Sequence, residues 1–346
     1  MSKPIITIIG LGLTGSSMGL GLQREAGNFE IVGHDKLPEV SQAARRTGAV
    51  QRTEWNLYKA IAGAELIVVA VPLHELEELL PLLAEEIQPG TLIFAINSLL
   101  QPAIDSGARH LPDGVHFVAG HAIVAGVGMT PTPRADLFEK ATFALTAGVK
   151  TDPAALQLAS DFVERVGATP LFVDAQEHDG VIAGVEQLPR LLAAALMRVS
   201  AQGAGWREAR RLAGRHFASG TEMGDDAAGL LAGLEANKAN VLLKLQQVRQ
   251  ELEAWQALLE AHEAAPLLDA AAKEKRDRGD SAEPPSPLLS ALQEAVQARQ
   301  TWEGQVIVKN WEEQPDTPKV TATESTGFLR QMFLGGLGNR QRNNRK

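Results

Sequence analysis

A glycine-rich turn near the start of the chain has the residue types and spacing of a phosphate-binding loop. Three glycines follow an apolar run and open a stretch of helical pattern. In such a turn the first glycine permits the sharp bend, the second lets the backbone approach a pyrophosphate, and the third lets the helix pack closely on the strand. The free N–H groups at the helix start stabilise the phosphates. The spacing predicts a dinucleotide site made by Gly10, Leu11, Gly12, Leu13, Thr14 and Gly15.

An acidic residue stands where this motif requires one. A second apolar run ends at Asp35, twenty residues beyond Gly15, where the carboxylate binds the ribose hydroxyls of the dinucleotide. The negative charge repels a 2′-phosphate and therefore favours NAD, while Lys36 beside it keeps NADP possible. Glycines that serve only a turn are the alternative interpretation. The strand, the helix and the acid together favour the cofactor site.

Val71 and Pro72 lie at the carboxyl end of the third expected strand. Ligands of open α/β sheets bind outside the carboxyl ends of the strands. Both residues are therefore expected to contact the cofactor. A proline that does no more than end the strand is an equally good interpretation.

The elements that must position these residues alternate along the first half of the chain. Strands are expected at 5–9, 30–33, 66–71, 91–96, 115–119 and 142–146, with helices at 16–25, 40–47 and 73–86. Short apolar strands that alternate with helices indicate a parallel sheet covered on both faces. The pattern predicts an α/β Rossmann domain, doubly wound with a mainly parallel sheet, over residues 1–150.

Beyond residue 150 the pattern becomes almost wholly helical, which predicts an all-α C-terminal domain over 151–272. Breaks are expected at 203–205 and 219–226, and residues 230–259 form one long helix or two nearly continuous ones. A helix of this length usually packs against another helix, often one from a second subunit. Residues 273–346 are predicted to form a proline-rich linker, a helix at 288–302, a possible hairpin at 304–310 and 319–323, and a basic tail.

Composition excludes several classes of protein. The net charge of −9 over 346 residues disfavours binding to nucleic acid. The absence of cysteine removes disulfides, thiolate metal sites and thiol nucleophiles, and no metal site is expected. The N-terminus lacks the basic leader of a secretion signal, and no uninterrupted apolar run is long enough to cross a membrane. We therefore expect a cytoplasmic protein without a membrane partner.

Over residues 5–260 the chain resembles the prephenate dehydrogenase family. The resemblance is carried by residues 10–15 with Ser17, by 32–35, 66–73, 97–98, 117–121 with 125–126, 135–139, 177–179 and 188–189. The first three segments occur in many dehydrogenases. The histidine segment at 117–121, the Asp-Leu-Phe-Glu segment within 135–139 and the His-Asp pair within 177–179, in this order, are far more specific.

The resemblance implies an oxidative decarboxylation of prephenate to 4-hydroxyphenylpyruvate, a step of tyrosine biosynthesis, with transfer of a hydride to the nicotinamide. It also implies that the helical domain dimerises, so we expect a homodimer. It places His121 as the acceptor at the ring hydroxyl and Ser98 as its hydrogen-bonding companion and nicotinamide contact. A neutral imidazole suits this task because its pKa is near 7. From the residues alone, His121 is a loop histidine bonded to backbone. His178 and Asp179 lack a third metal ligand, so helix capping or an interdomain hydrogen bond is favoured.

The substrate side departs from the family pattern. Residues 95–100 lack the family's acid and lysine, Ala122 replaces a proline, and the family's carboxylate-binding arginine has no counterpart near 217–221. The family's Ser-His-Leu-Pro-His segment reads Glu186-Gln187-Leu-Pro-Arg190 here. Gln187 and Arg190 are therefore the predicted substrate contacts. Three functions stay open: a prephenate or arogenate dehydrogenase, a dehydrogenase of the same fold acting on another hydroxy acid or an imine, and an inactive dinucleotide-binding relative.

Overall fold

The computed structural model describes residues 3–23, 27–124, 132–224, 226–262 and 286–307. Its contacts divide the described chain into two compact units, with the boundary between Val241 and Leu242. The first unit contains a sheet with its covering helices and a following set of helices. All of the predicted site residues lie in this unit.

An eight-stranded sheet forms the centre of the first unit, with the strand order β3-β2-β1-β4-β5-β6-β7-β8. All strand pairs are parallel except β6 with β7, which are antiparallel. This confirms the mainly parallel sheet predicted from the sequence. The strands are β1 (Ile5–Ile9), β2 (Glu30–His34), β3 (Arg52–Thr53), β4 (Ala64–Val69), β5 (Leu92–Ile96), β6 (His116–Ile123), β7 (Thr142–Ala147) and β8 (Thr169–Phe172).

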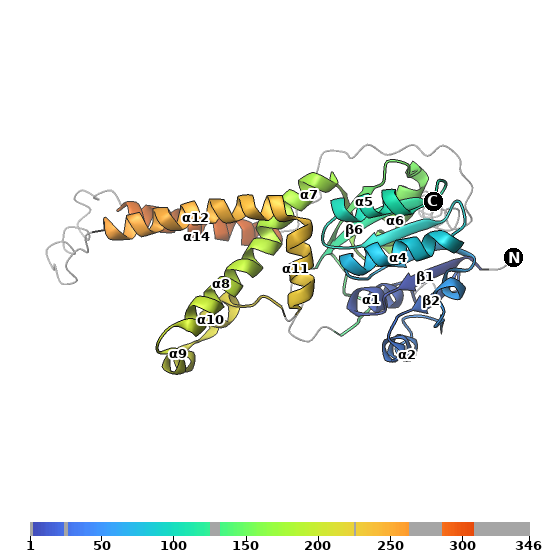
Figure 1. The fold of residues 1–346 in the computed structure, drawn as a ribbon, viewed down its shortest axis with the longest axis horizontal. Helices are drawn as coiled ribbons and strands as arrows, with labels where there is room; N and C mark the ends of the chain where they lie inside the picture. The colour runs from blue at the N-terminus through green and yellow to red at the C-terminus, as the bar shows by residue number, and fades with distance from the viewer. Residues whose placement is uncertain (1–2, 24–26, 125–131, 225, 263–285, 308–346) are drawn as a thin grey trace, which may run out of the picture. The chain divides into compact units, whose positions relative to one another are not determined.

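Helices cover both faces of this sheet because its strands are apolar on both sides. Helices α1 (Leu13–Leu22), α2 (Pro38–Arg46) and α6 (Pro153–Arg165) pack on one face. Helices α3 (Leu57–Ile61), α4 (Leu73–Glu86) and α5 (Gln101–His110) pack on the other, where Figure 1 shows α4 and α5 lying across the strands. The doubly wound arrangement is thereby confirmed.

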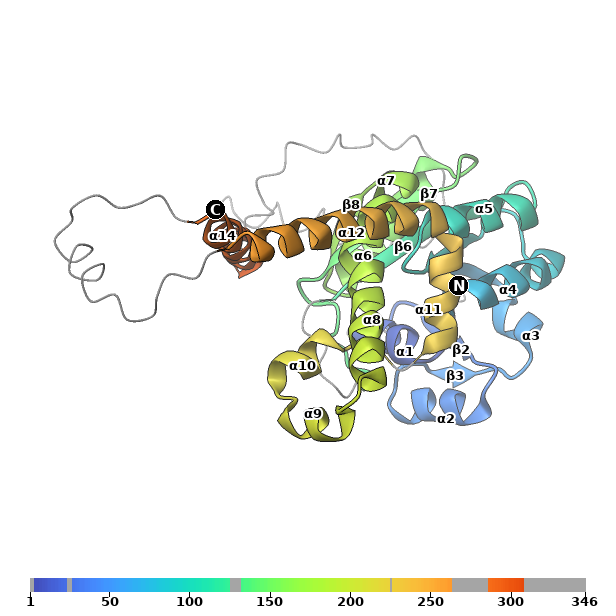
Figure 2. The same ribbon diagram turned by 60° about the vertical axis from the view of Figure 1, so that its left-hand side comes forward.

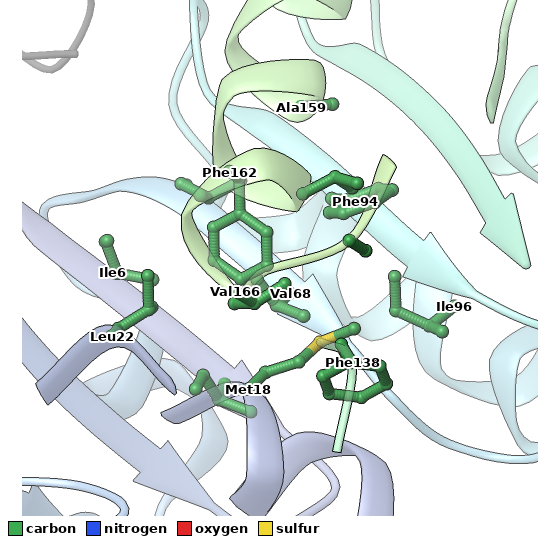
Figure 3. Close-up of a cluster of buried hydrophobic side chains, with 14 of the residues drawn as sticks. Ile6, Met18, Leu22, Val68, Phe94, Ile96, Phe138, Ala159, Phe162 and Val166 are labelled. Atoms are coloured by element: carbon green, nitrogen blue, oxygen red, sulfur yellow. The ribbon is translucent and has the colours of Figure 1, made fainter. Parts of the chain in front are cut away.

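The larger core lies between α1, α6 and the sheet. Figure 3 shows Met18 of α1 and Phe162 of α6 pointing into the same cluster as Phe94 of β5. The Phe94 and Phe162 rings meet edge to face with their centroids 5.8 Å apart, a favourable geometry for aromatic pairs. Phe138, from a segment that the family resemblance singled out, is buried here as well, so that segment contributes to the core.

The sheet unit continues beyond residue 150, where the change in composition placed the predicted boundary. β8 pairs with β7 in parallel register, from Thr142 with Thr169 to Leu145 with Phe172. The preceding helix α6 buries Phe162 and Val163 completely against the sheet. Its alanine-rich sequence resembles that of the later helices, so composition alone does not separate α6 from them.

The helices that follow confirm the predicted breaks. The chain continues through α7 (Ala175–Ile182), a π-helical turn η2 (Ala183–Gln187) and α8 (Leu188–Gln202), then α9 (Trp206–Leu212) and α10 (Arg215–Gly220). Helices α11 (Ala227–Ala236) and α12 (Lys238–Glu260) are the two nearly continuous helices that the pattern allowed. Figures 1 and 2 both show α11 beside α4, and it also contacts η2.

The run formed by α7, η2 and α8, Ala175–Gln202, reaches the length of a membrane-spanning helix and contains an 18-residue window with a mean hydropathy of 1.3. The sequence did not predict such a run, because no uninterrupted apolar stretch in it is that long. The run nevertheless includes buried polar side chains, Asp179 and Gln187 among them, which bind other elements of the same unit. Such contacts are those of a helix packed against protein.

The second unit contains α12 from Leu242 onward and α14 (Pro287–Ile307). Helix α14 confirms the helix expected at 288–302. It also contradicts the first strand of the possible hairpin at 304–310, because residues 304–307 are helical. The predicted linker, the second hairpin strand and the basic tail lie outside the described residues.

Candidate functional site

The glycine turn joins β1 to α1 at the carboxyl edge of the sheet. Gly10 adopts φ +85°, a left-handed conformation that side chains disfavour, and a Cβ on it would collide with the carbonyl of Ala70. A Cβ on Gly15 would collide with the carbonyl oxygen of Gly10. The first and third glycines are thus required by close backbone packing, as the motif predicts.

Gly12 differs from its two neighbours in the motif because a Cβ there would meet open space. It is the N-cap of α1, and because glycine has no side chain, no side-chain hydrogen bond caps the start of this helix. The first N–H groups of α1, from Leu13, Thr14 and Gly15, accordingly face the loop without a side-chain acceptor. A backbone that is both open and rich in donors fits a pyrophosphate.

Asp35 follows β2 and is bound to the glycine turn. Its carboxylate accepts hydrogen bonds from the backbone N–H of Leu11, at 2.8 Å, and from that of Leu37, at 2.9 Å. Leu11 itself is buried in the core beneath the turn. The neighbouring Lys36 forms an ion pair with Glu75 at 2.7 Å. The acid of the motif therefore lies next to the turn, and the adjacent positive charge is paired.

A cavity of about 440 Å³ opens between the glycine turn and the carboxyl ends of β2 and β4. Among the predicted cofactor residues, it is lined by Gly10, Gly12, Asp35, Val71 and Pro72. Leu11, Leu13, Thr14, Gly15 and Ser98 do not line it. Pro72 also serves as the N-cap of α4, so it ends one element, begins the next and borders the cavity.

Asn97 connects this cavity to the next strands. Its side-chain amide donates to the carbonyl oxygen of Val71 at 3.0 Å, and its backbone N–H donates to that of Gly120 at 2.9 Å. Its own side-chain oxygen is buried without a partner among the described residues. The asparagine thus links the segment after β4 to β6, and the family resemblance includes residues 97–98 but assigned a role to Ser98 only.

His121 lies on β6 directly beyond the point where β5 ends. The parallel pairing of β5 with β6 stops at Ile96 and Gly120, while β6 continues alone against β7, where His121 pairs with Ala144. A Cβ on Gly120 would come within 2.6 Å of the Phe143 ring and 2.8 Å of the Phe94 ring. The glycine therefore lets the aromatic core close beneath the histidine.

The hydrogen-bonding partner of His121 is His178. The Nδ1 of His121 lies 3.2 Å from the Nε2 of His178, with the two rings at 90°. The family resemblance had assigned the companion role to Ser98, which is exposed and shares no hydrogen bond with His121 among those described. Ser98 follows β5 at the same sheet edge, so its predicted nicotinamide contact stays a prediction.

His121 is held in its neutral form. Burial, and next the charge of His178, lower the pKa of His121 to about 4, although Asp179 acts in the opposite sense. A neutral imidazole carries one N–H and one unprotonated nitrogen. At neutral pH one ring nitrogen of His121 is therefore available as a proton acceptor.

Asp179 joins α7 to the sheet unit. One carboxylate oxygen accepts the N–H of Leu100 at 2.9 Å and the other accepts the N–H of Gln101 at 3.0 Å. The same carboxylate lies 2.9 Å from Nδ1 of His178. This confirms the expected capping role, with one correction: the capped helix is α5 and not α7, in which Asp179 is the fifth residue.

The π-helical turn η2 positions the segment that replaces the family's Ser-His-Leu-Pro-His. Pro189 lacks an N–H, and its ring disfavours a regular helix in the preceding turn. The wider turn Ala183–Gln187 directly precedes it. It brings a carboxylate oxygen of Glu186 to 3.7 Å from Nε2 of His121, a proximity that sequence reasoning did not predict.

Gln187 is buried and both of its polar ends are occupied. Its amide nitrogen donates to the carbonyl oxygen of Gly233 at 2.8 Å, and its oxygen accepts from Asn237 at 2.8 Å. Asn237 also donates to the backbone oxygen of Asp179. Gln187 thus links η2 to α11, and its predicted substrate contact stays a prediction. Asn237, in the short break between two helices, was missed.

Arg190 is held at the edge of the same site. Its Nε donates to the carbonyl oxygen of Met223 at 2.9 Å. A Cβ on Gly224, which has φ +79°, would lie 3.2 Å from one terminal nitrogen of Arg190. No ion pair joins Arg190 to an acidic side chain within the described ranges. The terminal nitrogens therefore stay available to a carboxylate.

The charge near His121 is mixed. Burial raises the pKa of Glu186, while Arg190 and His178 lower it to a smaller extent. No group of three metal-binding side chains occurs in the part of the chain that the structure describes. The site thus combines an acceptor imidazole, a partly buried acid and a cation, beside a cavity that fits a dinucleotide.

Comparison with known proteins gives two matching family models. The prephenate dehydrogenase nucleotide-binding domain matches residues 18–171, and the prephenate dehydrogenase dimerization domain matches residues 174–272. A probable prephenate dehydrogenase of Streptomyces niveus is 30% identical over 304 residues, which cover 84% of this chain and 75% of that protein. The prephenate dehydrogenase of Bacillus subtilis is 29% identical over 198 residues. That alignment spans about half of either chain, 56% of this one and 53% of the relative.

Two solved structures share the fold. A prephenate dehydrogenase from Aquifex aeolicus, in complex with hydroxyphenyl propionate and NAD+, matches with a TM-score of 0.72 at 20% identity, covering 87% of this chain and 99% of that one. An arogenate dehydrogenase from Synechocystis matches with a TM-score of 0.66 at 20% identity, covering 86% and 99%. At these identities the likeness shows the fold. The family models and the Streptomyces relative lead to one conclusion: the chain belongs to the prephenate dehydrogenase family.

Proposed function

We propose that this protein is an NAD-dependent prephenate dehydrogenase, which converts prephenate to 4-hydroxyphenylpyruvate. The observation that carries the proposal is the neutral imidazole of His121, which lies at the carboxyl edge of the sheet with an available acceptor nitrogen. Asn97 forms hydrogen bonds both to β6, the strand that carries His121, and to Val71 in the lining of the predicted cofactor cavity. A proton acceptor next to a dinucleotide site is the arrangement that oxidation of a ring alcohol requires.

The residues of the turn fit a dinucleotide. Gly12 and the start of α1 would hold the pyrophosphate, Asp35 the adenosine ribose, and Val71 and Pro72 the wall of the cavity. When bound, the nicotinamide ring supplies the hydride acceptor of the reaction. The charge of Asp35 favours NAD over NADP, and the pairing of Lys36 with Glu75 removes the cation that would have offset it.

The chain's own residues then act on the substrate. The unprotonated Nε2 of His121 accepts the proton of the ring hydroxyl, while loss of the ring carboxyl group as carbon dioxide restores aromaticity. Arg190 supplies the cation for the remaining carboxylate, because its terminal nitrogens carry no acidic partner among the described side chains. Ser98 contacts the nicotinamide end from the carboxyl end of β5. Gln187 acts indirectly, by fixing the turn that holds Glu186.

Glu186 poses an electrostatic problem for a dianionic substrate. Its carboxyl group lies 3.7 Å from the nitrogen that receives the proton, and a second negative charge there would repel the substrate. Burial already raises the pKa of Glu186, and a bound anion would raise it further. We infer that Glu186 is protonated when substrate is bound, so that it donates a hydrogen bond in place of repelling the carboxylate.

The active form is proposed to be a homodimer in the cytoplasm. The helical run Ala175–Gln202 exposes an apolar stripe, and the family model that matches this part of the chain is a dimerization domain. A stripe of this kind is buried when two copies associate. Its exposed members are Val181, Val185, Leu192, Leu196 and Val199.

A substrate panel tests the proposed activity. Purified protein is incubated with NAD or NADP and with prephenate, arogenate or other hydroxy acids, and reduced nicotinamide is followed by its absorbance. Turnover of prephenate with NAD is the expected result. Turnover of another hydroxy acid alone would favour a dehydrogenase of this fold with a different substrate. This is the chief alternative function, because the family's carboxylate-binding arginine is missing near 217–221. Cofactor binding without any turnover would favour an inactive relative.

A further inference from the structure

Three titratable side chains form a continuous line from the buried side of the site to its opening. Asp179 lies 2.9 Å from Nδ1 of His178, and Nε2 of His178 lies 3.2 Å from Nδ1 of His121. The side chains of Asp179 and His178 are 5% and 6% exposed, whereas that of His121 is 14% exposed. Solvent and substrate therefore reach this line at the His121 end.

Hydrogen bonding fixes where the protons lie along the line. The carboxylate of Asp179 only accepts, so Nδ1 of His178 carries a hydrogen. In neutral His178 the other nitrogen, Nε2, is then an acceptor and faces a hydrogen on Nδ1 of His121. In neutral His121 the remaining nitrogen, Nε2, is left unprotonated. The carboxylate thus determines the tautomer of both rings and makes Nε2 of His121 the acceptor toward the substrate.

We propose that His178 and Asp179 form a two-histidine proton relay, in which His178 is the group that stores the proton released by the substrate. This rests on the proposed dehydrogenase activity. As the O–H bond of the ring hydroxyl breaks, its proton binds Nε2 of His121. The hydrogen on Nδ1 of His121 moves to Nε2 of His178. His121 ends neutral with its hydrogen on Nε2, and His178 ends as an imidazolium beside the Asp179 carboxylate.

The surroundings favour this direction of transfer. His121 is a poor place for a positive charge, because its burial lowers its pKa. His178 has a carboxylate in direct contact, and that carboxylate is itself stabilised by the N–H groups of Leu100 and Gln101 at the start of α5. The other charged groups near His121 are Glu186 of η2 and, beyond it, Arg190 of α8. Glu186 faces its Nε2 end, whereas Asp179, beyond His178, attracts the proton away from the substrate.

The conservative variant His178→Gln separates a relay from simple positioning. A glutamine amide accepts the hydrogen of His121 Nδ1 with its oxygen and donates to Asp179 with its nitrogen, so both hydrogen bonds can persist. It cannot take up a proton. The relay predicts that the single-turnover rate with prephenate and NAD falls about 10- to 100-fold, while KM and NAD affinity stay within twofold of wild type. His110→Gln, in which a histidine bound to Glu77 is replaced, is the matched control.

Nitrogen NMR of the histidine side chains gives a readout that does not depend on activity. In wild type at neutral pH, the relay requires His121 with hydrogen on Nδ1 and His178 with hydrogen on Nδ1. The His178→Gln variant must retain the His121 tautomer. A His121 resonance pattern with hydrogen on Nε2, or a His178→Gln rate within twofold of wild type, would overturn the relay. If wild type turned over no substrate, the proposed function would fail while the NMR result still decided the resting proton arrangement.

Discussion

The cofactor end and the substrate end of this site are built in different ways. The cofactor end is shaped mainly by backbone: Gly10, Gly12 and Gly15 form the turn between β1 and α1, and Asp35 from the end of β2 binds that turn. The substrate end joins side chains from widely separated segments, such as His121 to His178 and Gln187 to Asn237. The cofactor end thus depends on backbone geometry, and the substrate end depends on side-chain chemistry.

This difference explains which parts of the site depart from the family pattern. Backbone packing tolerates almost no change at the first and third glycines, because any Cβ there collides with a carbonyl group. The substrate end permits exchange of side chains, as at Glu186 and Arg190, where the segment keeps the family's Leu-Pro pair and forms a π-helical turn. Substrate preference can therefore vary while the cofactor site stays constant.

The largest expected effect lies at the substrate end. His121→Asn keeps a polar side chain but removes the acceptor nitrogen, so kcat should fall by about 10²- to 10⁴-fold. NAD affinity should change by less than about twofold, because His121 does not line the cofactor cavity. Steady-state kinetics and calorimetric titration measure the two quantities. An equal loss of both would show that the two ends are not separable.

The next largest effect is expected from a variant that disrupts only the cofactor site. Gly12→Val places its side chain in open space, so the fold should be retained while the pyrophosphate is excluded. The Kd for NAD should rise at least about 10-fold, which corresponds to about 1.4 kcal/mol. Gly27→Val, also in open space but outside the site, is the control. An unchanged Kd in the Gly12 variant would place the cofactor elsewhere.

A smaller effect is expected at the substrate cation. Arg190→Lys retains the charge but loses the planar guanidinium and its bond to the Met223 carbonyl. KM for prephenate should rise about 10-fold, with kcat changed much less. Arg198→Lys, at an exposed position on the same helix, should leave both constants unchanged. Identical kinetics for the two variants would remove Arg190 from the substrate site.

The smallest effect concerns the choice of cofactor. Asp35→Asn removes the negative charge beside the expected ribose and keeps a side-chain oxygen for the N–H of Leu11. The preference for NAD over NADP, expressed as a ratio of kcat/KM values, should fall about fivefold, or roughly 1 kcal/mol. Lys36→Gln, which removes the neighbouring charge that is paired with Glu75, should move the ratio much less.

The same contrast separates what the sequence predicted from what it missed. The Rossmann fold, the glycine turn and the breaks in the helical region follow from local pattern, and the structure confirms them. The end of the sheet domain was misplaced because α6 is as rich in alanine as the later helices. The hydrogen bond between His121 and His178 joins residues 57 positions apart, and no local sequence pattern predicts such a contact.

A crystal structure with NAD and a hydroxyphenyl carboxylate bound tests the central claim most directly. The measured quantity is the distance from Nε2 of His121 to the ring oxygen of the ligand. The account predicts a hydrogen bond between these two atoms, with the pyrophosphate at Gly12 and the ligand carboxylate at Arg190. A ring oxygen bound to another side chain, with His121 turned away from the nicotinamide, would contradict it.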